Sequence, residues 1–251
     1  MFDLRLINAE LLKTSRRRGM LAIAVLITMG FGALAFVVSA IQHATDPAKH
    51  AAAGGLASLQ DARPTVLLLV LIMASIVGAT AGTQDLESGV FRDLAATGRA
   101  RGALFGARFT GALGVTLPIT ALTAAMLAAG SLLLADGTPL PQAGDIVAAT
   151  GLLVAAAVLA TAAGVGAGAL FGSRGPVIGL LLGFFLAIDP LLASIGFLGD
   201  ARAIVPSEAL HRIGGMPVQT HLGAGVAIAV VAAWVAAALG AGAWRTQHRE
   251  V

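Results

Sequence analysis

The residues best suited to chemistry or docking lie in one charged stretch, 84–101, between long apolar runs. Leu86, Val90 and Leu94 are spaced by four residues, which predicts one apolar stripe along an amphipathic helix. Phe91 lies beside this stripe, and Gly98 is typical of a glycine that ends a helix. We expect a short helix at a membrane surface, although a solvated loop that keeps positive charge in the cytoplasm gives a similar pattern. The ionisable residues of the stretch are Asp85, Glu87, Arg92, Asp93, Arg99 and Arg101.

Several kinds of catalytic or metal site are missing from the sequence. The chain has no cysteine, which excludes disulfides, thiolate nucleophiles and cysteine-ligated metals. It contains neither the glycine–lysine motif of a phosphate-binding loop nor a G-x-S-x-G nucleophile motif. The histidines are scattered and no pair has metal-ligand spacing. We therefore expect no enzyme, no metal site and no cofactor bound by this chain.

The composition indicates a helical membrane protein. Of 251 residues, 57% are hydrophobic and 12% charged, which is far more apolar than a soluble domain of this size. The isoelectric point near 10.5 is explained by positively charged cytoplasmic ends, so we expect no nucleic-acid partner.

Six apolar runs are long enough to cross a bilayer as helices, since a span needs roughly 20 residues. In the third run Pro118 should kink the helix, and we expect Arg108 to extend to the membrane interface. The expected spans are 20–41, 66–83, 107–135, 146–171, 177–198 and 222–244.

The first 18 residues predict a helix that lies along the inner leaflet. Leu4, Ile7 and Leu11 share one face, whereas Lys13 lies on the opposite, charged face. The pair Arg16–Arg17 before an apolar run also fits a twin-arginine export signal, but the following run is longer than usual for such a signal.

The distribution of basic residues sets the orientation. With the N-terminus inside, the outer loops contain only four of the chain's lysines and arginines. The positive-inside rule then places both termini in the cytoplasm. The four outer residues are Lys49, Arg63, Arg202 and Arg212.

Asp189 and Pro190 interrupt the fifth run after half a span. Aspartate before proline is typical of a helix start, so Asp189 is expected to cap a new helix beginning at Pro190. The alternative is a cargo or proton contact at an outer gate. We expect residues 190–213 to form short re-entrant or outer helices, with a helix start at Pro206 and a break at Gly214.

Small residues recur at every fourth position in the fourth span, which is typical of a close helix-packing face. The members of this face are Ala156, Ala160, Gly164, Gly168 and Gly172.

Together these features resemble the membrane subunit of a bacterial ABC-2 type transporter. The local match is the stretch from Asp85 through Gly89 to Leu94, followed by Gly98 and Arg99. It is similar to the family's stretch of an acidic residue, a glycine four positions later and then a hydrophobic residue, followed by a small-residue turn and a basic residue. The sequence Glu10-Leu11-Leu12-Lys13 also resembles the family's opening. The topological resemblance covers the whole chain.

The resemblance implies that 84–101 is a coupling helix that docks on a cytosolic ATPase. The residues implicated in that docking are Asp85, Leu86, Glu87, Gly89, Val90, Phe91, Arg92 and Leu94. It also implies two copies of a separate ATPase chain that binds ATP and Mg²⁺, a second permease copy in a homodimer, and a place in the bacterial inner membrane. The expected function is ATP-driven export of a hydrophobic or amphiphilic cargo, such as a drug or lipid.

A different class of protein also fits the sequence: an ATP-independent secondary transporter, or the membrane anchor of a signalling complex. An ion-coupled carrier is expected to hold ionisable residues inside its helical bundle. Asp189 is the one acid placed inside a predicted span.

Overall fold

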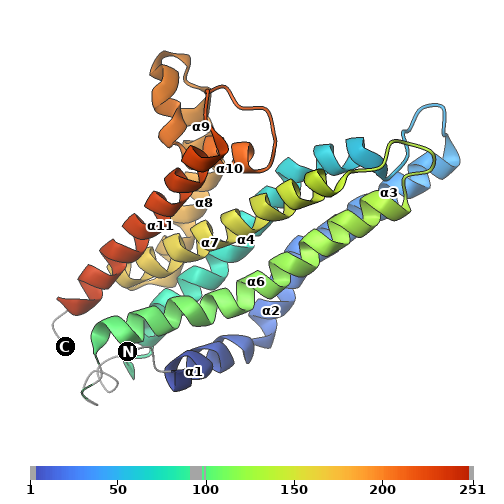
Figure 1. Cartoon of the computed structure of the whole chain (residues 1–251). Helices are drawn as coiled ribbons and strands as arrows, with labels where there is room; N and C mark the ends of the chain where they lie inside the picture. The colour runs from blue at the N-terminus through green and yellow to red at the C-terminus, as the bar shows by residue number, and fades with distance from the viewer. Residues whose placement is uncertain (1–3, 91–97, 99, 249–251) are drawn as a thin grey trace.

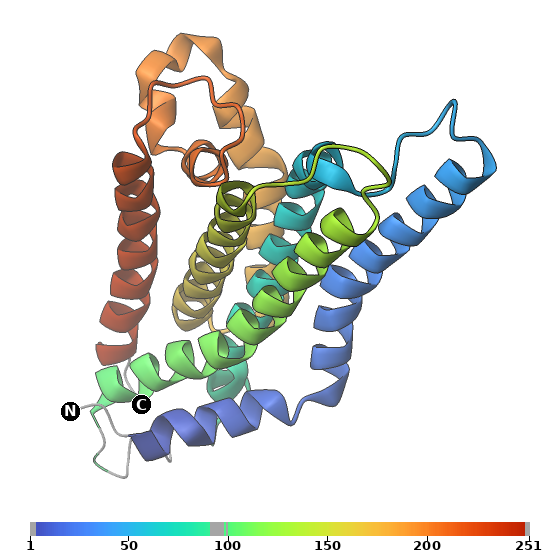
Figure 2. The same ribbon diagram turned by 45° about the vertical axis from the view of Figure 1, so that its right-hand side comes forward.

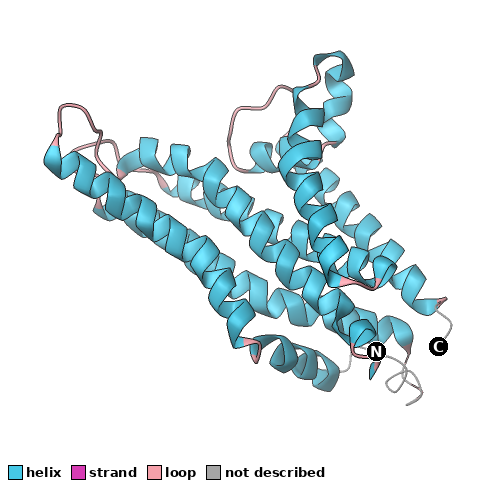
Figure 3. Ribbon diagram, turned by 180° about the vertical axis from the view of Figure 1, so that it is seen from behind, coloured by secondary structure: helices cyan, strands magenta, loops and turns pink. Residues whose placement is uncertain are grey.

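The structure, a computed structural model of the 251-residue chain, describes residues 4–90, 98 and 100–248. In this part of the chain all regular structure is helical (Figures 1 and 3). Six helices are long and apolar enough to cross a membrane, so the predicted all-α, multi-pass architecture is confirmed. They are Arg18–Thr45, Gly55–Glu87, Arg101–Leu133, Ala143–Phe171, Arg174–Ser194 and Ala224–Gln247.

The N-terminal helix α1 (Leu4–Ser15) is separate from the first spanning helix. That spanning helix consists of α2 (Arg18–Val25), a π-helical turn η1 (Leu26–Gly30) and α3 (Phe31–Thr45). Figure 2 shows α1 lying across the end of the bundle at a steep angle to α2.

Helix α4 (Gly55–Glu87) is the most buried spanning helix and forms the centre of the bundle. It starts well before the predicted span 66–83 and continues past it. The prediction placed the polar residues before Val66 in an outer loop, but Pro64 is inside the helix and Arg63 is buried. The helix can include Arg63 because other parts of the chain accept its hydrogen bonds.

Helix α7 (Ala143–Phe171) lies against α4 with glycine facing glycine. A Cβ atom on Gly164 would lie 2.6 Å from the Ala79 nitrogen, and one on Gly168 would lie 2.9 Å from Gly82. Both α7 glycines belong to the small-residue face predicted for the fourth span. That packing face is therefore confirmed, and its last member, Gly172, ends α7 in the left-handed conformation.

Helix α6 (Arg101–Leu133) packs on α1, α4 and α7, and α11 (Ala224–Gln247) packs on α7. The contact between α11 and α7 is close at Gly242, where an added Cβ would lie 2.7 Å from Gly166. Elsewhere α11 is largely exposed on the bundle's outside, as a helix in contact with lipid would be.

The fifth spanning helix continues through Asp189, so the predicted helix break there is wrong. It consists of α8 (Arg174–Gly183), a π-helical turn η2 (Phe184–Ile188) and α9 (Asp189–Ser194). Asp189 is helical and its N–H bonds to the Phe184 carbonyl, the long bond of a π turn. The wider turn accommodates Pro190, which has no N–H and would clash with the carbonyl four residues earlier in a regular α-helix.

Two short helices connect the fifth and sixth spans, η3 (Gly196–Ile204) and α10 (Pro206–Ile213). The predicted start of α10 at Pro206 is confirmed, with the proline in the first turn. The predicted stop is confirmed too, because Gly214 follows the helix and Gly215 has a φ of 64°. Figure 1 shows these helices at the end of the bundle opposite both chain termini.

Candidate functional site

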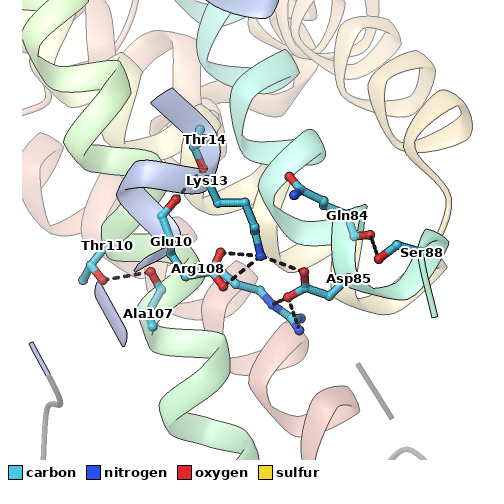
Figure 4. A network of polar contacts seen from close by, with 9 residues as sticks. All are labelled: Glu10, Lys13, Thr14, Gln84, Asp85, Ser88, Ala107, Arg108 and Thr110. Carbon is cyan, nitrogen blue, oxygen red and sulfur yellow. Dashed lines mark hydrogen bonds and ion pairs between the residues drawn. The ribbon is translucent and has the colours of Figure 1, made fainter. Parts of the chain in front are cut away.

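The carboxylate of Asp85, near the end of α4, is held by two basic side chains from two other helices (Figure 4). Arg108 on α6 donates from Nε at 3.0 Å and lies within 2.9 Å through Nη2. Lys13 on α1 donates to the other carboxylate oxygen at 2.7 Å. Asp85 is 3% exposed and Arg108 is 1% exposed. The cluster therefore joins three helices through one buried carboxylate.

Glu10 completes this cluster from α1. Its carboxylate accepts a hydrogen bond from Lys13 at 2.9 Å, and its backbone carbonyl accepts one from Thr14. Helix α1 also packs closely on α6, since a Cβ atom added to Gly111 of α6 would lie 2.8 Å from the Cβ atom of Glu10 on α1. Two carboxylates thus face two basic groups, which avoids an uncompensated buried charge. We call Glu10, Lys13, Asp85 and Arg108 the ionic cluster.

The ionic cluster corrects two expectations. Arg108 does not extend to the membrane interface but is buried and paired with Asp85. Asp85 is not free to contact a docked protein, because its carboxylate is engaged inside the bundle. The charge pattern offered only a partial signal for this pair: Asp85 and Arg108 have opposite charges near the adjoining ends of consecutive spans, but helix packing decides whether the two side chains meet.

The stretch 84–101 is not one helix, which corrects its predicted boundaries. Helix α4 extends to Glu87, and Ser88 closes it by donating both its N–H and its hydroxyl to the Gln84 carbonyl. Gly89 then adopts a φ of 73°, a conformation that separates Leu86 from Val90. The apolar stripe predicted across these residues therefore does not continue from α4.

Glu87 links the end of α4 to the start of α8. Its carboxylate accepts a 2.6 Å hydrogen bond from the Arg174 N–H, which is otherwise without a partner at a helix N-terminus. At the same end, the Arg101 guanidinium donates to the Gln247 carbonyl at the end of α11. Together with α1 of the ionic cluster, five helices therefore come together where the charged stretch leaves the bundle: α1, α4, α6, α8 and α11.

The remaining predicted docking residues lie at or beyond the described boundary. Val90 is 42% exposed. Phe91, Arg92 and Leu94 lie outside the described residues. Gly98 has a φ of 75°, the left-handed conformation expected of a glycine that ends a helix.

On α1 the predicted apolar face is divided between two environments. Leu11 packs against the core and Leu4 is 72% exposed. Ile7 is half-buried. Lys13, expected on the charged face, instead points into the ionic cluster.

At the opposite end Asp189 caps a helix, but a different one from that predicted. It is 3% exposed, and its carboxylate accepts a 3.2 Å hydrogen bond from the Ser207 N–H in the first turn of α10. An acceptor there satisfies a free N–H group and complements the helix dipole. Asp189 thus fastens α10 to the fifth span rather than starting a helix at Pro190.

Asp189 and Pro190 line a cavity of about 480 Å³ between α4, the fifth span and α10. Glu208 and His211 of α10 line the same cavity. Glu208 is 4% exposed and accepts hydrogen bonds from the Gln219 N–H and the Thr220 hydroxyl, both at 3.2 Å. Burial lowers the pKa of His211 below its ordinary value of 6.5, against the attraction of Glu208. At neutral pH this histidine is therefore uncharged.

Arg63 is a further buried charge that the sequence reading missed. Its guanidinium donates to the Gly214 carbonyl at 2.8 Å and to the Asp145 carbonyl at 3.3 Å. It lies 3.8 Å from the Asp145 carboxylate. It therefore joins α4 to the end of α10 and the start of α7.

Within the described part of the chain, no group of three or more histidine and acidic side chains could hold a metal ion. Comparison with protein-family models and with curated protein sequences gives no match to this chain. The fold defines its class, a helical multi-pass membrane protein.

Proposed function

We propose that this chain is the membrane subunit of an ABC-2 type exporter in the bacterial inner membrane, with both termini in the cytoplasm. In this proposal it works as a homodimer with two copies of a separate ATPase chain, which bind ATP and Mg²⁺. The observation that carries the proposal is the ionic cluster, because it connects the charged stretch to three helices at once.

The cluster offers a route for force between an ATPase and the spans. A protein docked on the segment from Val90 to Arg101 would pull on the ends of α4 and α6. The Asp85–Arg108 and Asp85–Lys13 pairs make α1, α4 and α6 move together, and the Glu87 bond adds α8. Coupling of this kind needs a rigid connection with different contacts in two global states.

In this scheme α1 rests on the inner leaflet as an interfacial helix. Its exposed leucines, Leu4 and Leu12, would face the lipid while Lys13 and Leu11 hold it to the bundle. The docking contacts fall to Val90, Phe91, Arg92 and Leu94. Asp85 and Glu87 instead hold helices together, because Asp85 bonds to α1 and α6 and Glu87 bonds to α8.

The decisive experiment reconstitutes the chain in proteoliposomes with the separate ATPase that the proposal requires. Phe91→Ala combined with Val90→Asp should uncouple ATP hydrolysis from transport, because it removes apolar side chains from the docking segment. The control is Val226→Ala, which shortens an exposed side chain of α11 far from this segment and should leave coupling unchanged. Aspartate is not used at position 226, because its charge would face lipid. Normal coupling in the double variant contradicts the proposal.

The second candidate function, an ion-coupled carrier, is supported by the acids in the cavity lined by Asp189 and Pro190. We call this cavity the outer cavity. Asp189 and Glu208 are ionisable groups within the helical bundle, as such a carrier needs. The same proteoliposomes separate the two: transport that follows an imposed proton gradient without ATP favours the carrier, and transport that requires ATP favours the exporter.

A further inference from the structure

The outer cavity combines apolar walls with two buried acids from different helices. Leu67, Leu71 and Phe185 form part of its apolar lining, and Asp189 and Glu208 supply carboxylates. Its volume of about 480 Å³ is within the usual range for small-molecule sites, which are mostly apolar with a few convergent polar groups.

No basic partner compensates these two acids among the described residues. The cavity lining contains neither lysine nor arginine, and neither Asp189 nor Glu208 forms an ion pair. The neutral His211 adds no positive charge at neutral pH. The hydrogen bonds to both carboxylates come from backbone N–H groups and a hydroxyl. They stabilise the acids without cancelling their charge.

The ionic cluster at the other end provides an internal comparison. There the equally buried Asp85 has two basic partners at 3.0 Å or less. A buried carboxylate without such partners carries a large desolvation cost. The outer cavity therefore lacks the positive charge that the chain supplies elsewhere.

We propose that the outer cavity binds an apolar organic cation, with the charge near Asp189 and Glu208 and the hydrophobic groups against α4 and the fifth span. A bare metal ion fits the cavity poorly, since the acids and His211 do not form a metal-binding group and the walls are apolar. A cation with hydrophobic substituents satisfies both the carboxylates and the walls.

Binding can be measured on the purified full-length chain in detergent without any ATPase, so this proposal is independent of the proposed export function. The probe is radiolabelled tetraphenylphosphonium in equilibrium dialysis, with excess unlabelled cation to define nonspecific uptake. Tetraphenylborate, an anion of matched shape, and uncharged tetraphenylmethane are the ligand controls. We expect the cation to bind saturably and neither control compound to bind.

Asp189→Asn and Glu208→Gln should each weaken cation binding about tenfold or more, because each removes a buried charge while retaining an acceptor. Asp200→Asn, at an exposed acid of η3, is the matched control and should bind normally. If either acid variant fails to fold, Ala193→Phe tests the same cavity by narrowing it, and should also weaken binding. Absence of saturable cation binding, equal binding of the anion, or unchanged affinity in the folded cavity variants would overturn the proposal.

Discussion

Asp85 and Arg108 form a buried ion pair between α4 and α6, with 2.9 Å between Arg108 Nη2 and Asp85 Oδ2. The two residues are 23 positions apart, with Asp85 at the start of the charged stretch and Arg108 beyond its end. The pair therefore joins the end of α4 to the first half of α6, while Lys13 attaches α1 to the same carboxylate.

Removing one partner of this pair should strongly destabilise the chain. Asp85→Ala leaves Arg108 buried without its carboxylate, a change that typically costs about 3–5 kcal/mol. The double variant Asp85→Leu with Arg108→Met should recover much of the loss, since Lys13 keeps Glu10 as a partner. Thermal unfolding in detergent gives the comparison. Equal stability of Asp85→Ala and the unsubstituted chain would show that the pair contributes nothing.

The glycine contact between α4 and α7 predicts a size limit at Gly164. Gly164→Ala places a methyl group 2.6 Å from the Ala79 nitrogen, so the helices must separate, at a cost of about 1–3 kcal/mol. Gly240→Ala on α11 is the matched control, because an added Cβ there meets nothing within 4 Å. We expect a lower unfolding temperature for the first variant alone. Equal unfolding temperatures would mean that α4 and α7 are not this close.

We expect protonation of His211 to lower the stability of the folded chain in weak acid. Burial lowers its pKa in the folded chain below 6.5, so the unfolded chain binds the proton more readily. The stabilisation is therefore present above about pH 6.5 and is lost as the pH falls through the lower folded pKa. Glu208 and Asp189 line the same cavity as His211, so the test compares His211→Gln with the unsubstituted chain. The variant should show a flatter dependence of unfolding temperature on pH, and parallel curves would contradict the assignment.

The chain has no native cysteine, so single introduced cysteines can test its orientation. With cytoplasmic termini, a membrane-impermeant maleimide should label positions 48, 140 and 212 from outside and positions 98 and 248 only after lysis. All five positions are exposed. Position 48 serves as the outer site before α4 in place of Gly55, because Gly55 is buried. Labelling of position 98 in intact cells would invert the topology and remove the proposed docking segment from the cytoplasm.

The sequence by itself determined the helical membrane class, the six spans and the packing face on α7. Each follows from local patterns: the length of an apolar run and the spacing of small residues are visible without knowing the fold. The helix start at Pro206 and the stop at Gly214 were predictable for the same reason, because proline and glycine act on their own backbone.

Only the tertiary structure decided which charges are paired. Whether Asp85 points outward or meets Arg108 and Lys13 depends on how three helices pack, which no local pattern records. Asp189 likewise caps a helix that begins 17 residues later along the chain, at Pro206, because α10 folds back onto the fifth span. A buried charge is tolerated or functional according to its partners, and distant parts of the chain supply those partners.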